Sequence, residues 1–185
     1  MSNQNYRNPA LKSGIPLCFV NIRSSGQAVT YEDLQDEIPR KLMLWQQQLI
    51  NAELRYVPCW HVVLDYHVAG LNRRNYHEGT MEFIVDERKG SSLIDDDVEF
   101  GFCYEQVNSR LITEGRFTME IAEKKAITDA RWKVGLSRFK SPPELSTVSI
   151  KKFYRPYFRA MVARSGRPSE VWIPADGYGN YFVYK

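Results

Sequence analysis

Two histidines and an aspartate in the segment CWHVVLDYHVAGL (59–71) are the first residues that could carry catalysis. His61, Asp65 and His67 are separated by even numbers of residues, so on a β-strand all three side chains point to the same face. At about 3.3 Å per residue, His61 and His67 lie about 20 Å apart along the strand, too far to bind one metal or to serve one triad. His67 and Asp65, about 6.6 Å apart, could form only a pair without an oriented third partner. The spacing favours surface or core histidines over an active site.

A run of three aspartates, Asp95 to Asp97, is the second candidate, because acid clusters can bind metal ions. An EF-hand loop has acids at alternating positions, a central glycine and a terminal glutamate. DDDVEFGF instead has three consecutive acids followed by a strand pattern. We interpret the run as a solvated turn that opens a strand. A metal site built from carboxylates on several elements stays open, because one sequence does not show which elements converge.

The motifs of nucleotide-binding and hydrolytic enzymes are missing: the chain has no GxGxxG after a strand, no GxxxxGK[ST] and no GxSxG. Cys18, Cys59 and Cys103 are far apart, without a Cys-x-x-Cys pair. This argues against a disulfide framework and a structural zinc site, and favours a reducing compartment. The prediction is a protein that is not an enzyme and has no catalytic residues, metal or cofactor.

The elements that would position a site begin after a polar segment. Residues 1–16 contain two prolines and a glycine and are predicted to form a flexible N-terminal arm. Residues 17–185 are predicted to form a single globular domain, beginning with a strand at 16–23. A helix is predicted from the N-cap Thr30, with acids in its first turns and a break at Pro39. Apolar residues at helical spacing continue it over 40–54.

Most of the remaining chain has the β-branched and aromatic composition of strands, bounded by turn residues. The expected strands are 59–71, 79–87, 97–107, 115–123, 145–162 and 170–174, with a short helix at 126–136. The connections between the strands are shorter than parallel crossovers need, so the pairing is predicted to be antiparallel. The expected fold class is α+β, an antiparallel sheet with helices packed on one face.

Membrane insertion is not expected. No apolar run approaches the roughly 18 residues needed to cross a bilayer, and the first residues lack the apolar core of a signal peptide. Ser2 stands where N-myristoylation requires glycine. The sequence therefore predicts a soluble protein of the cytosol or nucleus.

The strongest shift in composition is basic. Residues 131–167 contain ten Lys or Arg and a single acid, Glu144; the segment carries +9 and the rest of the chain sums to −6. Interleaved aromatics accompany these charges, and such stretches bind nucleic acid, anionic lipid or acidic protein. The predicted polyanion contacts are Lys151, Lys152, Arg155, Arg159, Arg164 and Arg167, with Arg7 and Lys12 of the arm assisting.

Three stretches of the chain together indicate a resemblance. VNIRSSGQAVTYEDL (20–34) is similar to the opening of the globular domain of rhabdovirus matrix proteins. DDDVEFGFCYEQV (95–107) followed by ITEGRFTMEIAEKKAITDARW (112–132) resembles the rabies-type members, in which an acidic turn leads into paired strands joined through Gly-Arg. The order and spacing agree over residues 17–136.

The resemblance implies a virion protein that condenses the nucleocapsid through the viral nucleoprotein, lies against the inner face of the envelope membrane, self-associates and supports budding. Its location would be the virion and the host cytoplasm and membranes, with nuclear entry left open. The arm is shorter than in many animal members and only weakly basic. Pro142 and Pro143 are followed by Glu144 and Leu145, so the Pro-Pro-x-Tyr budding motif is missing. A compact member from a plant-infecting virus would accommodate both departures.

Two other functions stay open. The first is a sequence-independent RNA-binding viral protein of the silencing-suppressor type, in which bases would stack on Tyr154, Tyr157 or Phe158. The second is a small hydrolase that uses His67 and Asp65. The matrix function depends on the cations of 131–167 lying together on one exposed surface.

Overall fold

The computed structural model describes residues 15–22, 47–69, 76–88, 90–94, 98–135, 142–164 and 167–176. Within these ranges the strands are β1 (Ile15–Ile22), β2 (Gln47–Ala69), β3 (Tyr76–Asp86), β4 (Gly90–Leu93), β5 (Val98–Glu105), β6 (Glu144–Arg164) and β7 (Arg167–Pro174). The helices of the described ranges are the 3-10 turn η2 (Ser109–Leu111) and the α-helix α2 (Met119–Gly135).

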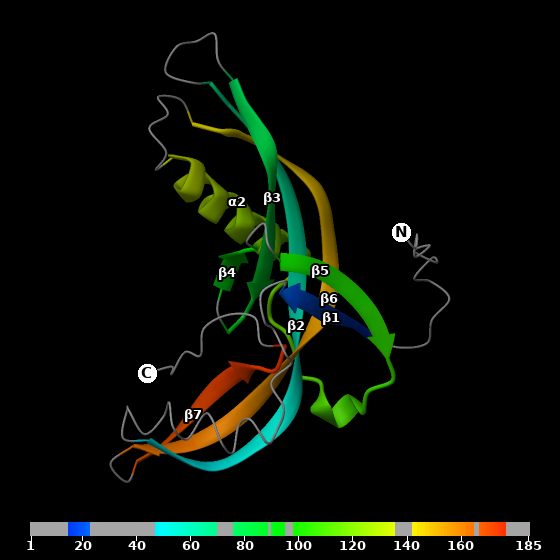
Figure 1. Cartoon of the computed structure of the whole chain (residues 1–185), viewed down its shortest axis with the longest axis vertical. Coiled ribbons are helices and arrows are strands. Elements are labelled where there is room, and N and C mark those ends of the chain that lie inside the picture. Colours follow the sequence, from blue (N-terminus) through cyan, green and yellow to red (C-terminus); the bar gives the residue numbers. More distant parts are fainter. Residues whose placement is uncertain are drawn as a thin grey trace.

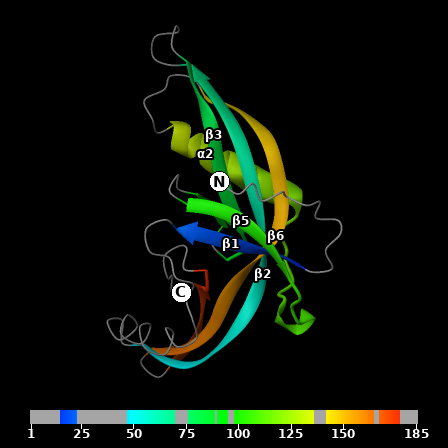
Figure 2. The ribbon, with the colours of Figure 1, turned by 45° about the vertical axis from the view of Figure 1, so that its right-hand side comes forward.

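The described strands form one sheet, in the order β4-β3-β2-β6-β1-β5, with β7 also paired to β6. Neighbouring strands run antiparallel except β1 and β6, which meet in parallel at Leu17 and Tyr154. The two longest strands, β2 and β6, have 23 and 21 residues and pair from Gln47 opposite Arg164 to His67 opposite Glu144. They form the long central ribbon of Figure 1, with β3, β4 and α2 along one half and β7 along the other. Figure 2 shows β1 and β5 crossing the middle of this ribbon.

The predicted fold class, α+β with helices packed on one face, is wrong. The described chain is mainly antiparallel sheet, and its single α-helix covers only part of one face. The helical segment expected over 40–54 is contradicted at its end, because residues 47–54 open β2. Residues 40–46, and the helix expected from Thr30 to Pro39, lie outside the described part.

A break in strand register explains why this stretch has helical spacing. The pairing of β2 with β6 shifts between Leu49 and Asn51, which leaves Ile50 exposed. The extra residue lets Leu49 and Ala52 pack against the same buried cluster as Leu54, although 49 and 52 have opposite parity. A β-bulge therefore produced the three-residue spacing that sequence alone attributes to a helix.

The strand predicted at 115–123 is also wrong, because α2 begins at Met119. The helix includes 126–135 of the short helix expected at 126–136, and residue 136 lies outside the described part. Ala122, Ala126 and Ala130, four residues apart and fully buried, place the backbone of α2 close to Val62 and Phe83 of the sheet. The start of the helix is held by Trp60, whose indole N–H donates to the carbonyl of Phe117 at 3.1 Å. These contacts with distant strands outweigh the β-forming side chains at the start of the segment.

The other predicted strands agree with the structure to within a few residues. The segments 16–23, 79–87, 97–107, 145–162 and 170–174 correspond to β1, β3, β5, β6 and β7, and 59–71 corresponds to the second half of β2. The short strand β4 was not predicted. β1 begins at Ile15, so two residues of the predicted arm lie in the sheet, and residues 1–14 are outside the described part.

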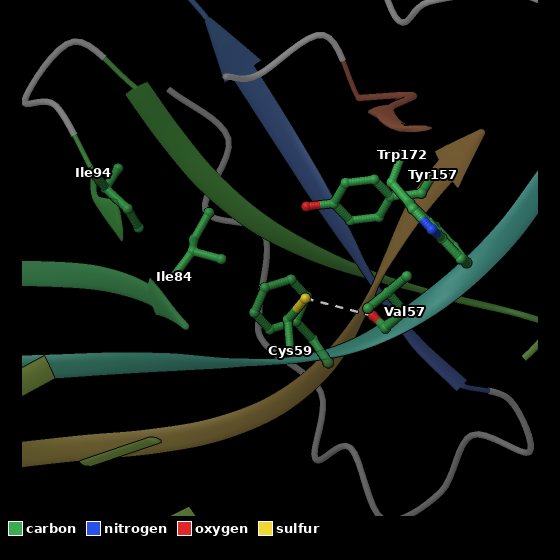
Figure 3. Packing of buried hydrophobic residues seen from close by; sticks show 7 residues of the cluster. Val57, Cys59, Ile84, Ile94, Tyr157 and Trp172 are labelled. Carbon is green, nitrogen blue, oxygen red and sulfur yellow. Dashed lines mark hydrogen bonds between the residues drawn. The ribbon is translucent and has the colours of Figure 1, made fainter. Parts of the chain in front are cut away.

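The face of the sheet opposite α2 has its own buried cluster, shown in Figure 3: Val57, Cys59, Ile84, Ile94, Phe153, Tyr157 and Trp172. Tyr157 and Trp172 meet edge to face, with ring centroids 6.3 Å apart. Since Val62, Leu64 and Phe83 are buried on the helix side, the central strands are covered on both faces near their middle. This core positions the charged residues of β6.

Candidate functional site

Arg155 is buried in the sheet core, with 2% of its surface exposed. Its Nε and Nη2 donate to Asp176 Oδ2 and Oδ1 at 2.5 and 2.9 Å. Burial alone would lower the pKa of the guanidinium, but the charge of Asp176 outweighs that effect and the pKa is raised. The prediction of Arg155 as a polyanion contact is therefore corrected: the side chain has no exposed charge to offer.

A hydroxyl and a second carboxylate extend this buried cluster. Tyr157 Oη donates to Asp86 Oδ2 at 3.0 Å and accepts from Arg155 Nη1 at 3.3 Å. Burial raises the pKa of Tyr157 well above 10.0, although the charge of Arg155 acts in the opposite direction. Asp86, Arg155, Tyr157 and Asp176 thus tie β3, β6 and the end of β7 together. These contacts indicate that the cluster stabilises the fold.

Arg159 is partly exposed, but carboxylates compensate its charge. Its Nε donates to Glu170 Oε2 at 2.7 Å, and its Nη1 donates to Glu53 Oε1 at 3.3 Å. The pKa of Glu53 is lowered by hydrogen bonds from Arg55 and then Arg159, which favour the ionised carboxylate. Arg159 is thus part of a surface ion-pair network that joins β2, β6 and β7.

The remaining predicted contacts do not share a surface in the described part of the chain. Lys151 and Lys152 are both exposed but are consecutive in β6, so they point to opposite faces. Lys151 Nζ lies 5.9 Å from the ring of Phe102, and Lys152 Nζ lies 5.8 Å from that of Trp60. Arg167 is exposed at the start of β7. Arg7, Lys12 and the side chain of Arg164 lie outside the described residues, as do Arg138 and Lys140. The single basic surface expected over 131–167 is not present among the described residues.

The aromatic residues expected to stack on RNA are mostly inaccessible. Tyr157 is fully buried and Phe158 is 7% exposed, while Tyr154 is half-buried. Lys152 Nζ lies 5.9 Å from the ring of Tyr154. The basic and aromatic run of β6 thus supplies little open ring surface.

Exposed cations do gather on α2. Because the alanine stripe faces the sheet, the opposite side of the helix faces solvent. We call this side the α2 outer face; its members are Ile121, Lys124, Lys125, Thr128, Arg131 and Trp132, all exposed. Trp132 is 65% exposed and Ile121 is 41% exposed, so this side of the helix presents two large apolar side chains beside its cations. A hollow of about 480 Å³ lies on this side of the helix, and its lining residues are Ile121, Lys124, Lys125, Thr128 and Asp129.

Two neighbouring acids, Glu120 and Asp129, reduce the charge of this region, but the helix as a whole carries four cations against three acids. Sequence reasoning missed Lys124 and Lys125, because it treated the preceding residues as a strand. The signal that could have found them is the spacing of Ala122, Ala126 and Ala130, which predicts a helix with its other side exposed.

His61 and His67 lie on the sheet face opposite α2. His61 Nε2 lies 2.7 Å from Glu82 Oε2, and His67 Nδ1 lies 3.7 Å from Glu78 Oε2. Burial lowers the pKa of His61, against the opposing effect of Glu82. Asp65 Oδ1 accepts from the hydroxyl of Thr80 at 2.8 Å. Asp65 and His67 therefore bind different residues of β3, an arrangement that does not support the hydrolase hypothesis, in which the two side chains act as a pair.

Metal and thiol chemistry find no support in the described ranges. No group of three or more His, Cys, Asp or Glu side chains there could hold a metal ion. Asp95, Asp96 and Asp97 lie outside those ranges. Cys59 and Cys103 are not joined in a disulfide. Burial and then Glu105 raise the pKa of Cys103, the opposite of what an activated nucleophile needs.

The described part of the chain contains no helix that is long and apolar enough to cross a bilayer. Comparison with known proteins adds no relative: no family model, no curated protein and no solved structure matches the chain.

Proposed function

We propose that the chain is a matrix-type structural protein that lies against an anionic membrane and contacts it through the α2 outer face. The observation that carries the proposal is Trp132, 65% exposed and next to Arg131 on a helix that the sheet holds in place. Indole rings favour the membrane–water interface, where an apolar ring and a polar N–H are both accommodated. Lys124 and Lys125 on the same side supply attraction to anionic headgroups.

The strength of such a contact can be bounded. Each Lys or Arg near an anionic bilayer contributes about 1 kcal/mol, and the contribution falls off within a Debye length. Three cations and an inserted indole give weak, salt-dependent binding by one copy. An array of copies on the same membrane would bind strongly through avidity, which suits a protein that lines a membrane.

RNA binding is the weaker proposal. Single-stranded nucleic acid is held by stacking on accessible aromatic rings, each contributing about 1–3 kcal/mol per base. Two of the three rings expected to do this, Tyr157 and Phe158, are buried. The exposed aromatic residue of α2 is Trp132, without a described neighbour that would continue a platform.

Flotation with phosphatidylserine-containing liposomes tests the proposal. We expect Lys124→Glu with Lys125→Glu to weaken binding by about 30-fold or more, since losing two contributions of about 1 kcal/mol already has that effect. Trp132→Ala should also weaken binding, and the loss should persist at high salt, because it removes apolar contact.

The matched control is Lys151→Glu with Lys152→Glu, the same charge change on β6. This variant should float like the wild type. Absence of binding at low salt, or equal losses for the two lysine pairs, would refute the α2 contact. Tight binding of the monomer to short RNA without lipid affinity would favour the RNA-binding function.

A further inference from the structure

The half of the sheet that carries α2 has an exposed polar surface on its other side. In one row, His67 of β2 lies between Glu78 of β3 and Glu144 of β6. In the next row, Asp65 lies between Thr80 and Ser146. Residues directly opposite in antiparallel strands share a face, so these six side chains form one surface, which we call the acidic sheet face. All six are exposed.

The side of this surface follows from strand alternation. Val62 and Leu64 pack under α2, so the odd-numbered Asp65 and His67 point away from it. Their rows on β3 and β6 point the same way. Figure 1 shows α2 lying along β2 and β3, and the acidic sheet face is on the reverse of those strands.

The charge of the acidic sheet face is opposite to that of the α2 outer face. It has three carboxylates, with Glu82 one row further along β3 and Lys151 at its border. A hollow of about 570 Å³ is lined by these rows together with Tyr66, Gly79 and Leu145.

We propose that the acidic sheet face docks the α2 outer face of a second copy of this chain. Glu78 and Glu144 are two strand spacings apart, about 9.6 Å. Lys124 and Arg131 are seven residues apart on α2, about 10.5 Å along its axis. A helix laid across the strands therefore brings one cation to each carboxylate, over His67 between them. In this arrangement Trp132, next to Arg131, packs against the acidic sheet face of the second copy and is shielded from solvent.

This contact is heterologous, because the two surfaces differ and lie on opposite sides of one sheet. Heterologous contacts that do not close into a ring form open-ended arrays. Helix and sheet layers would alternate along such an array. In addition to the membrane, the α2 outer face thus has a second ligand, for which anionic lipid would compete.

Sedimentation of the full chain at low salt tests the docking by charge exchange. The first variant is Glu78→Lys with Glu144→Lys, and the second is Lys124→Glu with Arg131→Glu. We expect each variant alone to associate about a hundredfold more weakly than the wild type, since like charges then meet across the contact. An equimolar mixture should associate again, because every contact between the two variants pairs opposite charges. A misfolded variant would not be rescued by mixing.

A wild type that stays monomeric at low salt would overturn the proposal, as would variants that associate normally or a mixture that does not recover. Liposome flotation separates this outcome from failure of the membrane contact. The Glu78→Lys, Glu144→Lys variant retains its α2 outer face and should still float. If the protein floats with liposomes but the wild type does not self-associate, only the docking proposal is refuted. If the charge-exchange variants behave as expected but the protein does not float, only the membrane contact is refuted.

Discussion

The cations of β6 and those of α2 have the same chemistry and different surroundings. Arg155 and Arg159 pair with carboxylates from other elements. Asp176 pairs with the buried Arg155, and Glu53 and Glu170 pair with Arg159. Lys124 and Arg131 project from a helix whose opposite side packs on the sheet. The difference lies in the partners that the fold supplies: the arginines of β6 pair with carboxylates from β2, β7 and the turn after β7, up to 106 residues away along the chain.

This comparison shows that a basic run in a sequence does not predict a basic surface. In β6 alternate residues face opposite sides of the sheet, so neighbouring charges separate, as Lys151 and Lys152 do. On a helix, residues three and four apart lie together, as Lys124 and Thr128 do. The same density of positive charge therefore gives a structural network in one region and an open surface in the other.

The largest effect is expected from breaking the buried ion pair. Arg155→Met leaves Asp176 buried without its cation, and such a change typically costs about 3–5 kcal/mol. Urea unfolding should show the loss as a lower midpoint. In Arg155→Met with Asp176→Leu, both charges are removed and most of the stability should return. A single variant as stable as the wild type would mean that the pair is not structural.

Tyr157→Phe removes the hydroxyl between Arg155 and Asp86 without removing a charge. We expect a loss of about 1.5–3 kcal/mol, the range for hydrogen bonds to charged groups. Guanidinium unfolding measures it, and Tyr154→Phe, at a half-buried ring of the same strand, is the control expected to change little. Equal losses for the two tyrosines would count against the cluster.

Because the pKa of Tyr157 is raised on folding, the protein should lose stability in alkali. The folded pKa of Tyr157 is raised well above 10.0, so above about pH 10 the unfolded chain releases a proton that the folded protein retains. Deprotonation therefore favours unfolding, and stability should fall as the pH rises past that point. Thermal unfolding across alkaline pH should show a smaller fall for Tyr157→Phe than for the wild type. An identical pH dependence would exclude Tyr157 as the cause.

Arg159→Ala should have a smaller effect, under about 1 kcal/mol, because solvent screens exposed ion pairs. A double-mutant cycle with Glu170→Ala isolates the coupling between the two side chains. A coupling that does not decrease with added salt would show that the pair is less exposed than the structure indicates.

The smallest effect is expected on α2. Lys124→Ala should change the free energy of unfolding by no more than about 0.5 kcal/mol, as for exposed residues away from specific contacts. Chemical unfolding checks this, and the same variant should weaken liposome flotation. A large loss of stability would show that Lys124, like Arg155, stabilises the fold.

Much of the sheet could be predicted because strands have a local signature. The segments that became β1, β3, β5, β6 and β7 were recognisable from β-branched and aromatic residues between turns. The errors occur where local pattern and tertiary contact disagree. The shift at Ile50 gave a strand the spacing of a helix, and FTMEI before Ala122 suggested a strand where a helix begins. The candidate site was found only in part, since the basic segment 131–167 includes Arg131 and Trp132 but begins after Lys124 and Lys125.

The sequence by itself determined the antiparallel strands, the missing nucleotide-binding and hydrolase motifs, and the concentration of cations in residues 131–167, one fifth of the chain. Only the tertiary structure decided which cations are compensated. Asp176 and Glu53 come from the turn after β7 and from β2, and they reach the arginines of β6 because the sheet brings them there. Asp86 of β3 reaches Tyr157 of β6 in the same way. Ion pairing depends on distance in space, which local sequence pattern does not encode, whereas strand alternation is a property of neighbouring residues.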